Sequence, residues 1–201
     1  MTINLMLGDC LERMKEIPDG SVDLTVTSPP YDNLRTYNNT LDWGEHVWKP
    51  VLQELFRVTK DGGVVVWIVN DATIKGSETG TSFRQALYFK ECGFNLHDTM
   101  IWEKQTFTAT GALKTRYAQV FEYMFVFTKG KVKTFNPIKD RLTKSKRKKH
   151  GTVRQSDGTT KKQSSIGKVY SEKEAQRFNV WKINTECSNN NRFHPAQFPE
   201  Q

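Results

Sequence analysis

A short polar motif follows an alternating apolar run near the start of the chain. Residues 22–26 alternate as a buried strand does, and Ser28-Pro29-Pro30-Tyr31 comes directly afterwards. Ligands of open α/β sheets bind at the carboxyl ends of the strands. The two prolines fix φ and remove two N–H donors, which leaves a stiff turn that offers carbonyl acceptors. Acceptors from Ser28 and Pro29, beside the flat ring of Tyr31, suit chemistry on the exocyclic amino group of an extruded nucleobase.

Apolar periodicity predicts the elements that position this motif. We expect strands over residues 3–7, 22–27, 64–69, 96–102, 123–128 and 178–183, and helices over residues 10–17, 47–58 and 83–92. Strands that alternate with helices indicate βαβ units, and therefore an α/β fold with a largely parallel sheet.

Several residues mark the ends of these elements. Asp9 is placed to cap the first helix, with Glu12 completing a capping box. Pro50 must lie in the first turn of the second helix or kink it. Residues 60–63, Lys-Asp-Gly-Gly, predict a helix stop and a turn, and Gly93 predicts a C′ position after the third helix.

Composition narrows the class of protein. Hydrophobic residues make up 36% of the chain, with 12 Phe and 5 Trp, which indicates a globular core. The three cysteines are scattered, which predicts reduced thiols in a cytoplasmic protein, and neither they nor the dispersed histidines predict a metal site. The first residues lack a basic signal region, and no apolar run approaches the length of a membrane span.

Positive charge is concentrated in one segment. Residues 131–182 hold 16 Lys or Arg against four acidic residues, a net charge of +12, so the rest of the chain carries −4 of the total +8. Residues 143–150 are a charge run, and residues 151–167 are rich in Ser, Thr, Gly, Lys and Gln. We expect this segment to be mobile by itself and to become ordered only on a polyanion such as DNA.

The end of the chain carries a second motif, His194-Pro195-Ala196-Gln197-Phe198-Pro199. Together with Thr27-Ser28-Pro29-Pro30-Tyr31, it resembles the DNA methyltransferases that use S-adenosylmethionine to make N4-methylcytosine or N6-methyladenine. The resemblance runs from Asn4 to Glu200. Ser28, in place of Asp, and Phe198, in place of the frequent Lys, are most similar to the cytosine-N4 branch.

The resemblance implies a Rossmann-like, S-adenosylmethionine-dependent methyltransferase fold and a set of site residues. The implied catalytic residues are Ser28, Pro29, Pro30 and Tyr31. The implied cofactor-binding residues are Asp9, Thr27, His194, Pro195 and Phe198. Its target-recognition region corresponds to the basic segment, which predicts that double-stranded DNA is contacted by Lys144, Lys146, Arg147, Lys148 and Lys149. Arg35 and Tyr37 lie in the polar loop after the Ser-Pro-Pro-Tyr motif, which either closes over the DNA or the extruded base or is an ordinary solvated loop.

The resemblance also implies three functional parts. Residues 1–130 correspond to the catalytic region, residues 131–178 to a basic target-recognition insertion, and residues 179–201 to a return segment that begins the cofactor-binding element. The family pattern continues with a glycine loop and two strands that this sequence does not contain. We therefore expect a truncated chain, a split enzyme whose second chain supplies the cofactor loop, or a remnant.

The leading hypothesis is a site-specific DNA methyltransferase of a restriction-modification type, with base flipping and methyl transfer to cytosine N4, favoured over adenine N6. The alternative is a catalytically inactive fragment that acts as a basic DNA-binding protein. A methyltransferase of RNA or of protein amides explains the basic insertion and the second motif less well.

Overall fold

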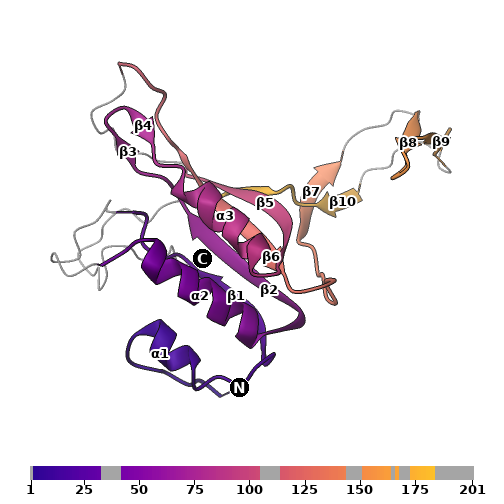
Figure 1. The fold of residues 1–201 in the computed structure, drawn as a ribbon. Coiled ribbons are helices and arrows are strands. Elements are labelled where there is room, and N and C mark those ends of the chain that lie inside the picture. Colours follow the sequence, from indigo (N-terminus) through magenta and orange to yellow (C-terminus); the bar gives the residue numbers. More distant parts are fainter. Residues whose placement is uncertain are drawn as a thin grey trace. The chain divides into compact units, whose positions relative to one another are not determined.

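The centre of the sheet is formed by the most apolar runs of the chain. In the computed structural model, β2 (Thr59–Val69) pairs antiparallel with β6 (Phe121–Thr128), which pairs antiparallel with β5 (Asn95–Glu103). β1 (Val22–Thr27) lies parallel to β2, and β11 (Val180–Lys182) lies parallel to β5. The order is β1-β2-β6-β5-β11, so four strands share one direction and β6 opposes them (Figure 1). The structure describes residues 2–32, 42–104, 114–143, 151–163, 166–167 and 173–183.

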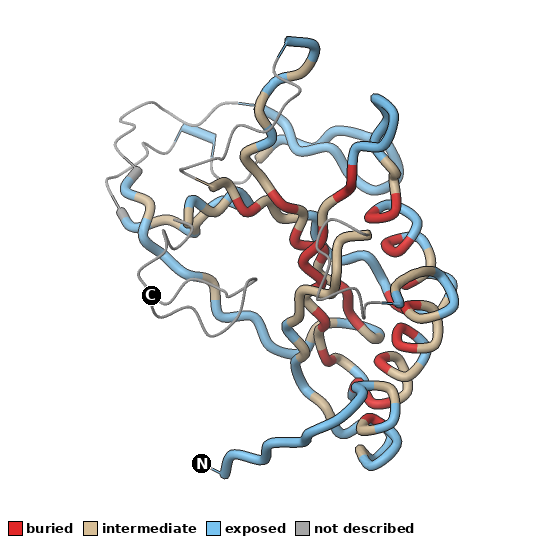
Figure 2. Tube along the Cα trace, turned by 90° about the vertical axis from the view of Figure 1, so that its left-hand side faces the viewer, coloured by how far each residue is buried: buried red, intermediate tan, exposed pale blue. Residues whose placement is uncertain are grey.

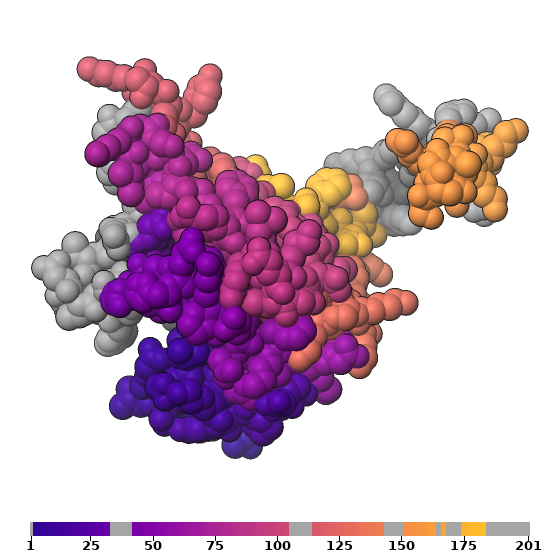
Figure 3. Space-filling model, in the orientation of Figure 1, coloured from indigo at the N-terminus to yellow at the C-terminus, as the bar shows by residue number. Residues whose placement is uncertain are grey.

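Two helices cover one face of this sheet. α2 (Glu45–Val58) and α3 (Thr81–Glu91) pack their apolar sides onto β2 and β6 (Figure 1). The buried residues follow the strands and the inner sides of the helices (Figure 2), and α2 and α3 lie in the middle of the face drawn in Figure 3. A smaller cluster around Ile68, Trp102 and Met124 lies apart from the helix-covered core. The predicted α/β fold is confirmed.

The first helix begins where the sequence predicts but is shorter. Asp9 is the N-cap of α1 (Cys10–Met14), and its Oδ1 accepts hydrogen bonds from the N–H groups of Leu11 and Glu12 at 2.9 and 3.3 Å. Glu12 accepts from Lys15 Nζ at 2.8 and 2.9 Å. The predicted N-cap is therefore present. The Glu12 side chain, which the capping box would direct back to Asp9, is bonded to Lys15 instead.

The strand predicted over residues 3–7 is wrong. These residues have no strand assignment, and Ile3, Leu5 and Leu7 are 81%, 90% and 97% exposed. An alternating segment becomes a strand only when a neighbouring strand supplies ladder hydrogen bonds and a packing face. No strand of the described part of the chain lies beside it, so its apolar alternation alone does not make it a strand.

The turn predicted at residues 60–63 is instead part of β2. Val22 pairs with Thr59 and Leu24 with Val64, so the register shifts across a bulge. Gly62 has φ +84°, and a Cβ atom there would lie 2.6 Å from Lys133 Cγ. Pro50 lies inside α2, beyond its first turn.

A short hairpin precedes α3. β3 (Thr73–Ile74) and β4 (Ser77–Glu78) pair antiparallel around Lys75 and Gly76, which both have positive φ. After α3, Gly93 has φ +110°, and a Cβ atom there would lie 2.8 Å from Phe56 Cζ. Glycine is therefore required at the predicted C′ position both by its backbone conformation and by the close approach of Phe56.

The chain divides into two units, residues 1–134 with 179–201 and residues 135–178. In the second unit, β7 (Lys139–Thr143) pairs antiparallel with β10 (Lys173–Gln176), and β8 (Thr152–Arg154) with β9 (Thr160–Lys162). Arg177 forms an ion pair with Asp140, which lowers the pKa of that carboxyl.

Within residues 151–167, which we expect to be mobile without DNA, β8 and β9 form a hairpin. Asp157 Oδ1 accepts hydrogen bonds from the N–H and the hydroxyl of Thr159 at 2.9 and 2.7 Å, and Gly158 has φ +84°. Asp-Gly between two short extended runs is a hairpin signal, and it outweighs the polar composition of this segment.

No helix in the described ranges is long and apolar enough to cross a membrane.

Candidate active site

Polar side chains from four strands gather at one edge of the sheet. Ser28 and Tyr31 follow β1, and Asp71 follows β2. Lys104 follows β5, and Glu122 lies at the beginning of β6, where it pairs with Trp102 of β5. Because β6 runs against the others, its amino end meets their carboxyl ends. This is the edge at which α/β sheets bind ligands.

A chain of hydrogen bonds joins the Ser-Pro-Pro-Tyr turn to the centre of the sheet. The hydroxyls of Ser28 and Tyr31 are 2.8 Å apart, and the Tyr31 hydroxyl donates to Glu122 Oε2 at 2.5 Å. Lys104 Nζ forms an ion pair with Glu122 Oε1. Glu122 is 7% exposed, so both of its oxygens are used inside the protein. The turn is therefore held by β6 as well as by its own prolines.

The turn presents its acceptors at the end of β1. Ser28, Pro29 and Pro30 are half-buried, and the ring of Tyr31 packs against the core cluster. No group in the described residues donates a hydrogen bond to the Pro29 carbonyl. The roles of these four residues toward a base remain predictions.

Asp32 continues the turn and binds it to the segment after β2. Its φ is +47°, and its Oδ2 accepts hydrogen bonds from the Thr79 hydroxyl at 2.6 Å and the Ala72 N–H at 3.2 Å. The backbone thus bends sharply after Tyr31, and residues 72–79 hold the bend in place.

Asp71 organises the neighbouring strand end. It is 5% exposed, and it accepts hydrogen bonds from the Ser82 N–H at 2.9 Å and from the Ser82 hydroxyl at 2.6 Å. The Thr79 hydroxyl, whose hydrogen goes to the nearer Asp32, lies 3.2 Å from Asp71 Oδ1. These bonds fasten the start of α3 to the end of β2. Burial, followed by the charges of Asp71 and Glu78, raises the pKa of Tyr123 on β6.

Replacing Asp71 by Ala should lower the free energy of unfolding by about 1–3 kcal/mol, because the N–H and the hydroxyl of Ser82 are left without their acceptor. Urea denaturation measures this change. Asp23→Ala is the control, because Asp23 forms only an exposed ion pair with Lys60 and should change stability by about 1 kcal/mol or less. Equal losses in the two variants would contradict the structural role of Asp71.

Only two of the predicted cofactor residues lie in the described part of the chain. Asp9 caps α1 through Oδ1, and its Oδ2 accepts no hydrogen bond from the described residues. Thr27 is the last residue of β1 and pairs with Trp67. His194, Pro195 and Phe198 lie outside the described residues.

The predicted DNA contacts also lie outside the described residues: Arg35, Tyr37, Lys144, Lys146, Arg147, Lys148 and Lys149. The basic residues that the structure does place in the second unit include Arg154, Lys161 and Lys162, which are exposed on the β8–β9 hairpin. No group of His, Cys, Asp and Glu side chains in the described ranges could hold a metal ion.

Sequence reasoning missed Glu122 and Lys104. The predicted strand began one residue after Glu122, so this carboxylate was assigned to no element. The signal was available, since Glu122 is an isolated charge that begins the run Phe121-Glu-Tyr-Met-Phe-Val-Phe-Thr128. A charge in a core strand must be paired, and the pairing with Lys104 depends on a β5–β6 register that the sequence alone does not give.

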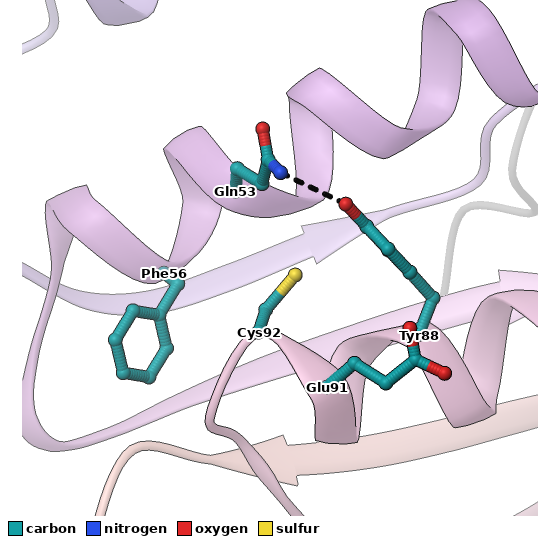
Figure 4. Close-up of a pocket in the computed structure, with 5 residues that line it drawn as sticks. All are labelled: Gln53, Phe56, Tyr88, Glu91 and Cys92. Atoms are coloured by element: carbon teal, nitrogen blue, oxygen red, sulfur yellow. Dashed lines mark hydrogen bonds between the residues drawn. The ribbon is translucent and has the colours of Figure 1, made fainter.

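One surface hollow of the described residues lies away from this site. It has a volume of about 430 Å³, lies between α2 and α3 and is lined by Gln53, Phe56, Tyr88, Glu91 and Cys92 (Figure 4). Gln53 Nε2 donates to the Tyr88 hydroxyl at 2.8 Å across it. Burial, followed by the charge of Glu91, raises the pKa of Cys92, so this thiol is not an activated nucleophile. The hollow takes no residue from the strand ends that carry Ser28.

A mostly parallel sheet with a Ser-Pro-Pro-Tyr turn at the carboxyl end of a strand defines the class of Rossmann-like methyltransferases. Residues 22–201 match the family model N6_N4_Mtase, DNA methylase. The chain belongs to this family of DNA methylases.

Individual relatives agree with this family. The orphan methyltransferase M.BamHII of Bacillus amyloliquefaciens is 51% identical over 199 residues, which cover 94% of this chain and 71% of the relative. The type II methyltransferase M.MthZI of Methanothermobacter thermautotrophicus is 29% identical over 164 residues, 64% of this chain and 45% of the relative. The chain thus spans less than half of M.MthZI and most of M.BamHII.

Solved structures show the same fold. The PvuII DNA methyltransferase, which is cytosine-N4-specific, superposes with a TM-score of 0.62 at 19% identity, over 96% of this chain and 64% of that one. TTHA0409 of Thermus thermophilus, solved in complex with S-adenosyl-L-methionine, has a TM-score of 0.50 at 26% identity, over 65% of this chain and 55% of that one. The predicted Rossmann-like methyltransferase fold is confirmed.

Proposed function

We propose that this chain carries the catalytic region of a DNA methyltransferase that moves a methyl group from S-adenosylmethionine to the exocyclic amino group of cytosine, with adenine as the second candidate. The observation that carries this proposal is the Ser28–Tyr31 turn at the ligand-binding edge of the sheet, in a chain that is 51% identical to a DNA methyltransferase. We further propose that the protein acts in the cytoplasm with DNA as its partner.

The amino nitrogen of a nucleobase is a weak nucleophile, because its lone pair is delocalised into the ring. Ser28 Oγ and the Pro29 carbonyl accept hydrogen bonds from the amino hydrogens, which favours a pyramidal nitrogen and stabilises the positive charge that develops there. S-adenosylmethionine supplies a methyl group on a sulfonium. When bound, it would release this methyl group to the nitrogen, with the S–C bond broken as the N–C bond forms, and the nitrogen would give up one proton to solvent.

The roles of the other turn residues follow from rigidity and shape. Pro30 keeps the turn in one conformation, and the ring of Tyr31 offers a face on which the extruded base can stack. Alignment of nitrogen, methyl and sulfur supplies much of the acceleration, because the groups react in one bound complex. Burial of the Tyr31 ring against the core supports its fixed orientation.

The described cofactor residues fit S-adenosylmethionine. Asp9 Oδ2 is free of described hydrogen bonds while Oδ1 holds the start of α1, so one carboxylate can cap the helix and accept a hydroxyl of the cofactor's adenosine. Thr27 lies at the end of β1, next to Ser28. His194, Pro195 and Phe198 complete the proposed set. A second chain that supplies the cofactor loop stays a prediction.

Methyl transfer is tested by incubating the purified chain with methyl-labelled S-adenosylmethionine and unmethylated DNA, followed by digestion and analysis of the nucleosides. We expect labelled N4-methylcytosine. Labelled N6-methyladenine would reassign the base to adenine. No transfer at high concentrations of protein and cofactor would favour the alternative, a catalytically inactive basic DNA-binding protein.

Binding to DNA should depend steeply on salt through the basic insertion. We expect that neutralising Lys144, Lys146, Arg147, Lys148 and Lys149 with Gln makes the plot of log K against log salt shallower, by about 0.9 for each phosphate that the protein no longer neutralises. Fluorescence anisotropy with a labelled duplex measures this slope.

The control for this experiment removes the same number of charges from the first unit. It replaces five exposed lysines with Gln: Lys15, Lys60, Lys75, Lys90 and Lys114. An equal change of slope in both variants would mean that binding follows the net charge of the chain, and would contradict a dedicated DNA contact in the insertion.

A further inference from the structure

We infer that Glu122 and Lys104 are positioning residues that set the direction of the hydrogen bonds at Ser28, so that its hydroxyl oxygen faces the substrate as an acceptor. The inference rests on the proposed function, since it concerns how Ser28 meets an amino group. Neither residue belongs to the Ser-Pro-Pro-Tyr motif, and both come from strands far along the chain from it.

The direction follows from the number of hydrogens available. A carboxylate only accepts, so the Tyr31 hydroxyl gives its single hydrogen to Glu122 Oε2, 2.5 Å away. The Tyr31 oxygen then has only lone pairs to offer Ser28, at 2.8 Å. Ser28 must therefore be the donor in that contact. Its hydrogen points to Tyr31, and the remaining lone pairs of Ser28 Oγ are left for the substrate.

Lys104 maintains this direction. Its ammonium can only donate hydrogen bonds, and it forms an ion pair with Glu122 Oε1. Oε1 is therefore held as an acceptor by Lys104, which leaves Oε2 as the acceptor for Tyr31. Lys104 Nζ also lies 5.8 Å from the centre of the Trp102 ring. The backbone N–H of Lys104 donates to the Val120 carbonyl at 2.6 Å. Contacts from β5 and from the segment before β6 thus position the ammonium next to Glu122.

The direction matters because a donor at Ser28 would oppose the reaction. An exocyclic amino group presents hydrogens in the plane of the base, and an acceptor at Ser28 binds one of them. A Ser28 hydrogen turned toward the substrate would instead meet those hydrogens or bind the nitrogen lone pair that must attack. Fixing the acceptor direction before substrate arrives avoids this reorganisation.

Glu122→Gln should reverse the direction of the hydrogen bonds from residue 122 through Tyr31 to Ser28 with almost no change in side-chain shape. Beside the Lys104 ammonium, the amide must turn its oxygen toward Lys104 and its NH₂ toward Tyr31. Tyr31 then accepts from Gln, its hydrogen points to Ser28, and Ser28 presents a hydrogen to the substrate. We expect kcat to fall by about a hundredfold, as when one preorganised polar contact to a developing charge is removed. KM for DNA should stay within about twofold, because phosphate contacts carry that affinity.

A second substitution tests whether direction, rather than a damaged fold, is the cause. In the Lys104→Met/Glu122→Gln double variant the ammonium is gone, so the amide oxygen can turn back to Tyr31. We expect kcat to recover at least tenfold over Glu122→Gln alone. Glu103→Gln, which loses only an exposed ion pair with Lys182, is the matched control.

Neutron diffraction of the deuterated chain tests the direction without any need for activity. The deuterium of Tyr31 should lie toward Glu122 and that of Ser28 toward Tyr31. A Ser28 deuterium turned away from Tyr31, or a double variant with kcat no higher than that of Glu122→Gln, would overturn the inference. Failure of the parent chain to transfer methyl would contradict the proposed function, and the neutron map would still decide the hydrogen-bond direction.

Discussion

Replacing Ser28 by Ala should lower methyl transfer by about a hundredfold or more while DNA binding changes little. The hydroxyl oxygen is the acceptor that we place on the amino hydrogen, and removing one such preorganised contact typically costs about 100- to 1,000-fold in turnover. Binding to DNA is carried by phosphate contacts that do not involve Ser28. Single-turnover methyl transfer and anisotropy binding, measured on the same preparation, separate the two effects.

The control for Ser28 is Ser21→Ala. The Ser21 hydroxyl donates to the Pro18 carbonyl in the exposed turn before β1, so this variant loses a serine hydroxyl and one hydrogen bond outside the site. It should keep nearly all of the activity. A parallel loss of transfer and of DNA binding in Ser28→Ala would mean that Ser28 supports the fold, and would count against its catalytic role.

Replacing Phe89 by Ala should lower the free energy of unfolding by about 3–5 kcal/mol, the usual cost of removing a buried aromatic side chain. Phe89 on α3 is fully buried and stacks on Phe127 of β6 with ring centres 3.9 Å apart. It also meets Trp67 of β2 and Phe94 edge-on, at 5.3 and 5.4 Å. The substitution would therefore leave a cavity where α3 meets the two central strands.

Phe83→Ala is the matched control on the same helix. Phe83 is 48% exposed and meets Tyr123 edge-on in the first turn of α3. We expect a loss of about 1 kcal/mol, since less apolar surface leaves contact with the protein and no enclosed cavity forms. Urea denaturation at constant pH measures both variants. Similar losses at Phe83 and Phe89 would contradict the position of the core beneath α3.

Much of the first unit is predictable because the periodicity of its elements is strong. The run Val64–Val69 and the stripe of α2 bury their apolar residues as expected, and the Ser-Pro-Pro-Tyr turn follows β1 as the sequence indicates. The strand predicted at residues 3–7 failed, because alternation describes only one strand while a ladder needs two. Local pattern thus predicts an element well when tertiary partners for it exist.

Only the Ser-Pro-Pro-Tyr part of the candidate site can be predicted from the sequence. Ser28 to Tyr31 form one continuous motif, so residue types and order suffice to find them. Glu122 and Lys104 join that motif through the register of β5 and β6, and a shift of one residue would turn Glu122 to the other face of the sheet. Such partners emerge from pairing across the sheet, which no local pattern specifies.

The hydrogen bond from Tyr31 to Glu122 also sets the time at which the site can form during synthesis. It joins residues 91 positions apart, and Glu122 enters the sheet only when β6 pairs with β2 and β5. Long-range strand pairing is slow because the entropy of closing the loop is lost before the contacts between the strands stabilise the pair. On the ribosome, Ser28 and Tyr31 therefore emerge long before their partner. Chains whose translation stops before β6 therefore cannot assemble the hydrogen-bonded site.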